Sequence, residues 1–381
     1  MITGLVTKPV SVNRNRIACF FSTSGHSGVD RAMQHLIPAL TERGYGVDLL
    51  HVRKHGPYIK APPAGMRLID LGTRHTYLSV FAVARYLRRE RPVVMLSDKD
   101  RVNRTALLAR FLANVPTRLV LSSGTTISID LASRGGLERW IQRHSMGKLY
   151  PLADKVIVTS KGVADDMAAY TGLARRHIDV VPSPVVSQRL FVEPQPRPPH
   201  PWFAAGQPPV VLGVGELGKR KDFATLMRAF ALVRRRYPCR LVILGEGRQR
   251  QSLQALAVEL GLHEDVDLPG YQNPYPYMAH AAVFVLSSRW EGLGFVLIEA
   301  LAVGTPVVAT DCPSGPREIL QDGRYGPLVN VADSEALAGA ILSVLERPLP
   351  AATLREAALS YEIEYSTTAY LAAMGLPPEA G

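Results

Sequence analysis

Residues 283–310 read VFVLSSRWEGLGFVLIEALAVGTPVVAT. The stretch opens on the apolar run Val283–Ser287 and closes on the apolar run Pro306–Thr310, each typical of a buried strand. Between them lie a glycine-containing turn and an apolar segment long enough for a helix. Two such strands joined by a helix are typical of a parallel sheet that helices cover on both faces. The stretch therefore predicts an α/β fold.

The same alternation of strand and helix recurs on both sides of a proline-rich stretch. In the second half, Phe223, Leu226, Met227 and Phe230 recur with the spacing of one helix face. Seven prolines lie within residues 194–209, and proline is incompatible with a helix interior or a central strand. We therefore predict two doubly wound Rossmann-like domains facing across a cleft: an N-terminal domain (1–190), a linker (191–209), a C-terminal domain (210–350) and a tail (351–381) expected to pack back on the N-terminal domain.

Positive charge is concentrated in the first half. Residues 1–190 carry 28 Lys and Arg against 13 Asp and Glu, whereas residues 191–381 carry 16 against 20. This asymmetry predicts an anionic partner for the first half, and a well-solvated surface is the alternative. Two predicted helices with Phe81, Tyr86 and Trp140 nearby would suit an anionic membrane surface; their basic residues are Arg85, Arg88, Arg89, Arg91, Arg134, Arg139, Arg143 and Lys148.

Several classes of protein are disfavoured. Three widely spaced cysteines do not form a disulfide framework or a zinc cluster, and no run of about 18 apolar residues is present. We expect a cytoplasmic protein, at most peripheral on the inner face of the cell membrane. The chain has no zinc finger, RNP-like aromatic pair or Walker lysine, so nucleic acid is not expected as a partner.

The first motif with chemical meaning is Gly213-Val214-Gly215-Glu216-Leu217-Gly218, followed by Lys219, Arg220 and Lys221. Its G-x-G-x-x-G spacing is that of a dinucleotide-binding turn, but the next helix begins only near Asp222, which is a favourable N-cap residue. The alternative interpretation is a phosphate site, because three cations at a helix start can face a diphosphate.

The second motif runs from Glu291 to Glu299, with Gly292-Leu293-Gly294-Phe295 between the two carboxylates. Glu291 is predicted to precede a helix and Glu299 to lie about two turns inside it. The N–H groups of residues 292–295 can hold an anion at the helix start. Glu299 can accept hydrogen bonds from a polyol such as ribose.

Residues 208–330 resemble the nucleotide-binding domain of retaining glycosyltransferases of the GT-B fold, family four. The resemblance rests on Gly215-Glu216-Leu217 with Lys221–Leu226, on Leu241–Gly247, on the E-x7-E motif of Glu291 and Glu299, and on Gly304–Asp311. The N-terminal half is less similar, but Ser24–Arg31 resembles the family's glycine-rich loop. Two positions depart from the family: Glu216 stands where an arginine is usual, and Ser122–Thr126 stands where many members carry a histidine.

The resemblance implies a metal-independent glycosyltransferase of hexosyltransferase type that uses a UDP or GDP sugar and no other cofactor. It implies a glycan or lipid-linked acceptor. Lys221 and Arg220 would stabilise the leaving diphosphate, and Glu291 would bind a hydroxyl of the donor sugar. The remaining donor-binding residues would be Gly25, Gly28, Gly215, Gly245, Gly247, Tyr271, Gly292, Leu293, Gly294, Phe295 and Glu299, and the acceptor-binding residues His26, Asp30 and Arg31. Asp98-Lys99-Asp100 spells a D-x-D metal motif, but no metal site is predicted there.

Three alternatives stay open. An epimerase of the same fold would isomerise a nucleotide sugar without an acceptor. An oxidoreductase would bind NAD(P) at the glycine-rich turn. A non-catalytic subunit would bind a nucleotide diphosphate and turn nothing over.

Overall fold

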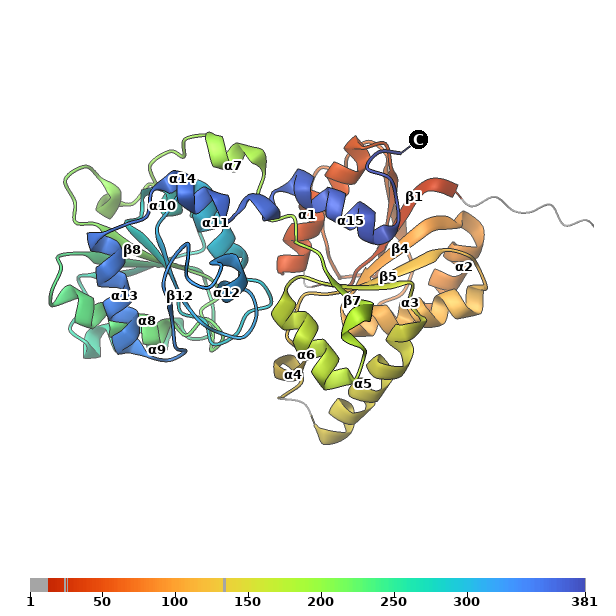
Figure 1. Ribbon diagram of the computed structural model, residues 1–381, viewed down its shortest axis with the longest axis horizontal. Helices are drawn as coiled ribbons and strands as arrows, with labels where there is room; N and C mark the ends of the chain where they lie inside the picture. Colours follow the sequence, from red (N-terminus) through yellow and green to blue (C-terminus); the bar gives the residue numbers. More distant parts are fainter. Residues whose placement is uncertain (1–12, 24, 26, 133–134, 381) are drawn as a thin grey trace, which may run out of the picture.

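The computed structural model describes residues 13–23, 25, 27–132 and 135–380, which form two α/β domains (Figure 1). The sheet of the N-terminal domain has seven parallel strands in the order β3-β2-β1-β4-β5-β6-β7. Its strands are β1 (Asn13–Phe20), β2 (Gly46–His51), β3 (Met66–Asp70), β4 (Pro92–Asp98), β5 (Arg118–Ser123), β6 (Lys155–Val158) and β7 (Ile178–Val180).

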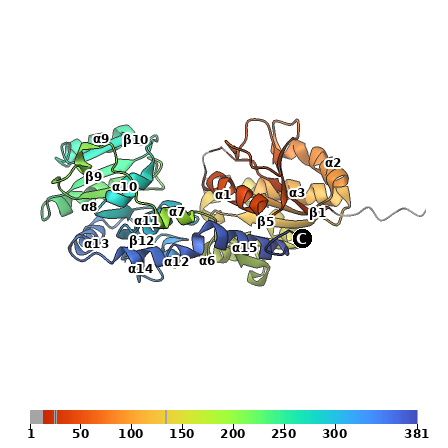
Figure 2. The same cartoon turned by 90° about the horizontal axis from the view of Figure 1, so that it is seen from above.

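Helices cover both faces of this sheet. One face is covered by α1 (Gly28–Glu42) and by the C-terminal helix α15 (Ile363–Met374). The other is covered by α2 (Val80–Glu90), α3 (Asp100–Ala113), α4 (Ile127–Ala132), α5 (Gly136–Leu149) and α6 (Lys161–Thr171), with the short 3-10 turns η1 (Thr76–Ser79), η2 (Tyr150–Leu152) and η3 (Arg175–His177). Figure 2 shows α15 running beneath the N-terminal domain, beside α1.

The C-terminal domain has a six-stranded parallel sheet in the order β10-β9-β8-β11-β12-β13. Its strands are β8 (Val210–Val214), β9 (Arg240–Leu244), β10 (Val266–Gly270), β11 (Val283–Leu286), β12 (Val307–Thr310) and β13 (Leu328–Val329). One face packs against α8 (Phe223–Arg234), α9 (Arg250–Glu259) and α13 (Ser334–Glu346), and the other against α10 (Pro274–His280), α11 (Phe295–Val303) and α14 (Ala351–Glu356). The short helix α12 (Pro316–Ile319) follows β12. The predicted pair of doubly wound domains is confirmed.

The chain crosses between the domains at a different place from the predicted linker. The proline-rich stretch packs on the C-terminal domain, where α7 (Gln188–Val192) and the turn η4 (Pro201–Phe203) bury Phe191 and Phe203 in its core. The crossing is made by residues 181–187, which lie beside the turn η5 (Leu359–Tyr361) on the returning chain. The amide of Val185 donates to the carbonyl of Tyr361 at 2.9 Å, and that of Ile363 to the carbonyl of Val186 at 3.0 Å. Two adjacent segments therefore connect the domains.

One local expectation was wrong and another was confirmed only in part. Helix α11 begins at Phe295, because Gly294 has a left-handed backbone (φ 97°) that a helix cannot include, so Glu299 lies about one turn inside the helix rather than two. Asp222 does occupy the N-cap position of α8, but its side chain makes no capping bond. Its carboxylate instead accepts from Thr225 Oγ1 at 2.9 Å and pairs with Arg289 at 2.9 Å.

Candidate active site

A buried cluster of charges lies where β8 and β11 end. Lys221 Nζ is 2.7 Å from Glu291 Oε1, and Arg220 Nη1 is 3.0 Å from Glu291 Oε2. Ser288 Oγ donates to Glu291 Oε1 at 2.7 Å. Lys221 and Glu291 are both buried, whereas Arg220 is partly exposed. The structure thus brings the three predicted catalytic residues together.

Electrostatics keep the Glu291 carboxylate ionised. Burial alone would raise its pKa, but Lys221 and Arg220 outweigh burial and hold the pKa below the ordinary value. Both carboxylate oxygens are already bonded, so Glu291 positions the two cations in this structure rather than presenting a free acceptor to a sugar hydroxyl. Two cations face one carboxylate, which leaves a net positive charge suited to an anion.

Glu299 is the second carboxylate of the site and is completely buried. Its Oε1 forms an ion pair with Arg31 of α1 and accepts from the hydroxyl of Tyr275 at 3.3 Å. Its Oε2 has no hydrogen-bond partner among the described residues. A buried charged oxygen without a donor is costly, so Oε2 fits a ligand that supplies hydroxyl donors.

The start of α1 meets the start of α11 in the other domain. A Cβ on Gly28 would lie 3.7 Å from the ring of Phe295, and the Arg31 guanidinium lies 5.8 Å from the centre of the same ring. Arg31, predicted to bind the acceptor, therefore contacts two predicted donor-binding residues. Gly25 has a φ of 87° and packs against the ring of Tyr58, whereas His26 lies outside the described residues.

Asp30 is occupied as a capping residue, which the prediction of acceptor binding did not anticipate. Its carboxylate accepts from Ser27 N at 2.7 Å and Ser27 Oγ at 2.6 Å, and also from Thr23 Oγ1. Ser27 in turn caps the α1 backbone, which completes a capping box. Asp30 thus fixes the segment that leads into α1.

The other predicted donor-binding residues divide into backbone and surface positions. Gly215, Gly245 and Gly247 lie in two loops packed backbone to backbone, since a Cβ on Gly245 would meet the Gly215 carbonyl and one on Gly247 the Leu217 backbone. Tyr271 follows β10 and is 83% exposed. The side chain of Leu293 is buried in the core of the C-terminal domain.

The loops that follow β5 and β6 contact the loop that follows β11. Thr126 Oγ1 donates to the carbonyl of Glu291 at 3.1 Å, and Ser160 Oγ donates to that of Gly292 at 3.2 Å. A Cβ on Gly292 would overlap the carbonyl of Gly124. Where many family members carry a histidine, this chain has Gly124 and Thr126, which contact Gly292 and Glu291.

Sequence reasoning missed Ser288, which lies three residues before Glu291, and also Ser160 and Tyr275, whose contacts are with residues farther along the chain. In the D-x-D sequence, Asp100 pairs with Arg104 at 2.7 Å, whereas Asp98 is buried. Within the described ranges no group of three His, Cys, Asp or Glu side chains could hold a metal ion.

Comparison with known proteins identifies the family. Residues 199–361 match the family described as "Glycosyl transferases group 1", and residues 27–184 match the "Glycosyl transferase 4-like domain". The chain belongs to the group 1 glycosyltransferases. The two matches cover both domains and most of the chain.

Relatives within the family act on lipid-linked or cell-surface glycans according to their names. The N-acetylgalactosamine-N,N'-diacetylbacillosaminyl-diphospho-undecaprenol 4-alpha-N-acetylgalactosaminyltransferase of Campylobacter jejuni is 34% identical over 252 residues, and the match spans 65% of either chain. The lipopolysaccharide core biosynthesis glycosyltransferase LpsE of Rhizobium meliloti is 28% identical over 84% of this chain and 85% of its own.

Solved structures of low sequence identity share the fold. The HepE protein of Anabaena in complex with UDP has a TM-score of 0.74 at 16% identity, covering 94% of this chain and 99% of its own. The lipopolysaccharide outer core galactosyltransferase WaaB, in its apo form, has a TM-score of 0.73 at 19% identity, covering 94% and 99%. Both confirm the GT-B fold.

Proposed function

We propose that the protein is a glycosyltransferase that moves a sugar from a nucleoside-diphosphate sugar to an acceptor hydroxyl. The observation that carries the proposal is Glu299, a fully buried carboxylate with one oxygen unpartnered among the described residues, on the helix α11 that follows the loop of Glu291, which pairs with Lys221 and Arg220. The Glu299 carboxylate can accept hydrogen bonds from ribose hydroxyls, and the two cations can bind the negatively charged diphosphate.

The reaction breaks the bond between the anomeric carbon and the diphosphate oxygen, and the electron pair leaves with the diphosphate. The acceptor hydroxyl oxygen forms the new bond to the anomeric carbon, and its proton passes to an oxygen of the departing diphosphate. Negative charge grows on the departing diphosphate, where Lys221 and Arg220 provide the stabilisation that a Mg²⁺ ion would otherwise supply. The N–H groups at the start of α11 would add to it.

Retention of the anomeric configuration is proposed from the family motif of Glu291 and Glu299. We further propose a hexose donor with UDP or GDP and an acceptor that is a glycan or lipid-linked glycan of the cell surface. The named relatives support the acceptor class, since one acts on a diphospho-undecaprenol carrier and another in lipopolysaccharide core biosynthesis. Such a carrier would place the enzyme at the inner face of the membrane.

The direct test is thermal stabilisation by a panel of nucleoside diphosphates and their sugars, with Glu299→Ala and Lys221→Ala as site variants. Stabilisation by one nucleotide sugar that both variants weaken supports the donor site. Release of nucleoside diphosphate that depends on an added acceptor distinguishes transfer from epimerisation. Stabilisation by NAD(P) and by no nucleotide sugar would overturn the proposal.

A further inference from the structure

We propose that the outward side of α2, α3 and α5 is a docking surface for an anionic lipid bilayer. This surface, called here the basic–apolar face, carries exposed large apolar side chains on η1 and the three helices: Tyr77, Leu78, Phe81, Leu108, Phe111, Leu137, Trp140 and Ile141. The inference rests on the proposed function in one respect: the bilayer would carry the lipid-linked acceptor. Binding itself can be measured without donor or acceptor.

Exposed apolar side chains are concentrated on this part of the molecule. Residues 77–152 are about a fifth of the chain but hold nine of the seventeen large apolar side chains that lie exposed among the described residues. Phe81 is 77% exposed and Phe111 80% exposed. Single exposed apolar residues are ordinary, whereas a group of them on one side of a domain marks an interaction site.

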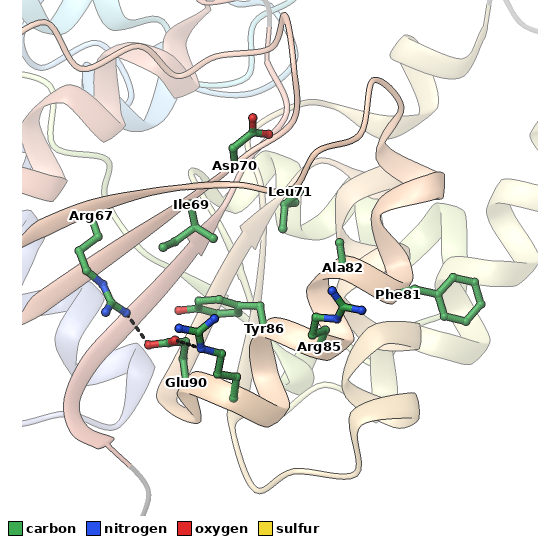
Figure 3. Close-up of a pocket in the computed structure, with 10 residues that line it drawn as sticks. Arg67, Ile69, Asp70, Leu71, Phe81, Ala82, Arg85, Tyr86 and Glu90 are labelled. Atoms are coloured by element: carbon green, nitrogen blue, oxygen red, sulfur yellow. Dashed lines mark hydrogen bonds and ion pairs between the residues drawn. The ribbon is translucent and has the colours of Figure 1, made fainter.

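The helices that carry these side chains adjoin one another. Helix α3 contacts α2, α5 and η1, so its exposed residues Leu108 and Phe111 connect the other two groups. Figure 1 shows α5 projecting from the N-terminal domain, with α2 and α3 beside the same sheet. Figure 3 shows Phe81 pointing away from α2 and from the sheet, next to Arg85.

The positive charge of the basic–apolar face favours an anionic partner. Residues 74–149 contain fourteen Lys and Arg against five Asp and Glu. Arg85, Arg139 and Lys148 are without an ion pair in the part of the chain that the structure describes. Anionic headgroups would neutralise them while the apolar side chains enter the acyl boundary. A second copy of this face would repel it, because both carry the same sign of charge.

The structure also removes two residues from the predicted membrane contact. Tyr86 is buried and donates its hydroxyl to Asp48 at 2.7 Å. The Arg88 guanidinium donates to the carbonyl oxygens of Leu112 and Ala113, so it ties α2 to the end of α3. Substituting either would perturb folding, and neither is suited to a test of docking.

The first test is co-sedimentation of the full chain with vesicles of phosphatidylcholine alone or mixed with phosphatidylglycerol. We expect at least tenfold stronger binding to the mixed vesicles at low salt, largely lost at high salt. Trp140→Ser and Phe111→Ser should each weaken that binding at least fivefold. Tyr365→Ser, an equally exposed aromatic position on α15, is the matched control and should bind as the unchanged protein does.

A second measurement locates the contact. Brominated lipid in the mixed vesicles should quench tryptophan fluorescence, and Trp140→Phe should abolish the quenching because the other two tryptophans lie in the C-terminal domain. Equal binding to both vesicle types, unchanged binding by the Trp140 and Phe111 variants, or self-association that these variants abolish would each overturn the proposal. Stabilisation by nucleotide, measured on every variant, reports separately on the donor site.

Discussion

Arg31, in the first turn of α1, forms an ion pair with Glu299, in the second turn of α11, and so joins the two domains at a buried carboxylate. The other oxygen of Glu299 has no partner among the described residues. A ribose hydroxyl that bonded to Oε1 would have to displace Arg31 from that oxygen. The donor's ribose and Arg31 of the other domain would therefore compete for the Glu299 carboxylate.

Substitutions at the two residues should therefore have opposite effects on nucleotide binding. Glu299→Gln should weaken UDP or GDP binding about tenfold or more, because a hydrogen bond to a charged group contributes about 1.5–3 kcal/mol. Arg31→Gln should tighten it several-fold, since no ion pair then has to be broken. Isothermal titration calorimetry measures both. Weaker binding by Arg31→Gln would show that Arg31 holds the donor instead of competing with it.

The Lys221–Glu291 pair should be important for stability as well as for chemistry. Lys221→Ala should lower the free energy of unfolding by about 3–5 kcal/mol, because it leaves the buried Glu291 with only the partly exposed Arg220. The double variant Lys221→Met with Glu291→Gln should recover most of that loss, since no buried charge remains. Urea unfolding measures the difference. A double variant no more stable than Lys221→Ala would contradict this account.

Much of the fold could be predicted from the sequence, and less of the site. The apolar runs Val283–Ser287 and Pro306–Thr310 correctly predicted β11 and β12, because buried parallel strands need near-continuous apolar residues. Strands β7 and β10 lack this signal, since β7 is only three residues long and β10 includes Asp267 and Pro269. The prolines of residues 194–209 predicted a linker, but Phe203 within this stretch and Phe191 just before it are buried in the core of the C-terminal domain.

The site shows the same division between local and distant information. The family resemblance placed Lys221, Arg220 and Glu291 in one site, but it assigned Glu291 to a sugar hydroxyl, whereas Glu291 contacts the two cations. The bonds from Ser27 and Thr23 to Asp30 depend on the loop conformation, which the sequence does not show. The partner of Arg31 is Glu299, which belongs to the other domain. The spacing of residues along the chain does not predict contacts between domains.

The close approach of Gly292 to the Gly124 carbonyl should be required for domain closure. Gly292→Ala would force these loops apart, and we expect the turnover rate to fall at least tenfold. Gly124→Ala is the matched control, since its Cβ would meet only the Thr159 methyl group at an ordinary 3.5 Å. Small-angle scattering with bound nucleotide should show a larger radius of gyration for Gly292→Ala alone. Identical scattering and turnover in the two variants would contradict the prediction.

Asp98, at the end of β4, should give the protein a stability that depends on pH. Burial raises its pKa to about 6, although Lys99 and a hydrogen bond from Ser122 oppose the shift; Asp30 on α1 adds to it. Between pH 4 and 6 the folded protein then binds more protons than the unfolded chain, so the free energy of unfolding falls as pH rises through about 6. The difference from the ordinary value of 3.8 corresponds to about 3 kcal/mol.

Asp98→Asn removes that titration and keeps the shape of the protonated side chain. The variant should match the unchanged protein near pH 4 and be more stable above pH 7, as calorimetric unfolding across this range would show. Asp70→Asn, at an exposed carboxylate, is the control and should leave the pH dependence unaltered. Parallel curves for Asp98→Asn and the unchanged protein would mean that Asp98 stays ionised when folded, and that its second oxygen, unpartnered among the described residues, is compensated by solvent.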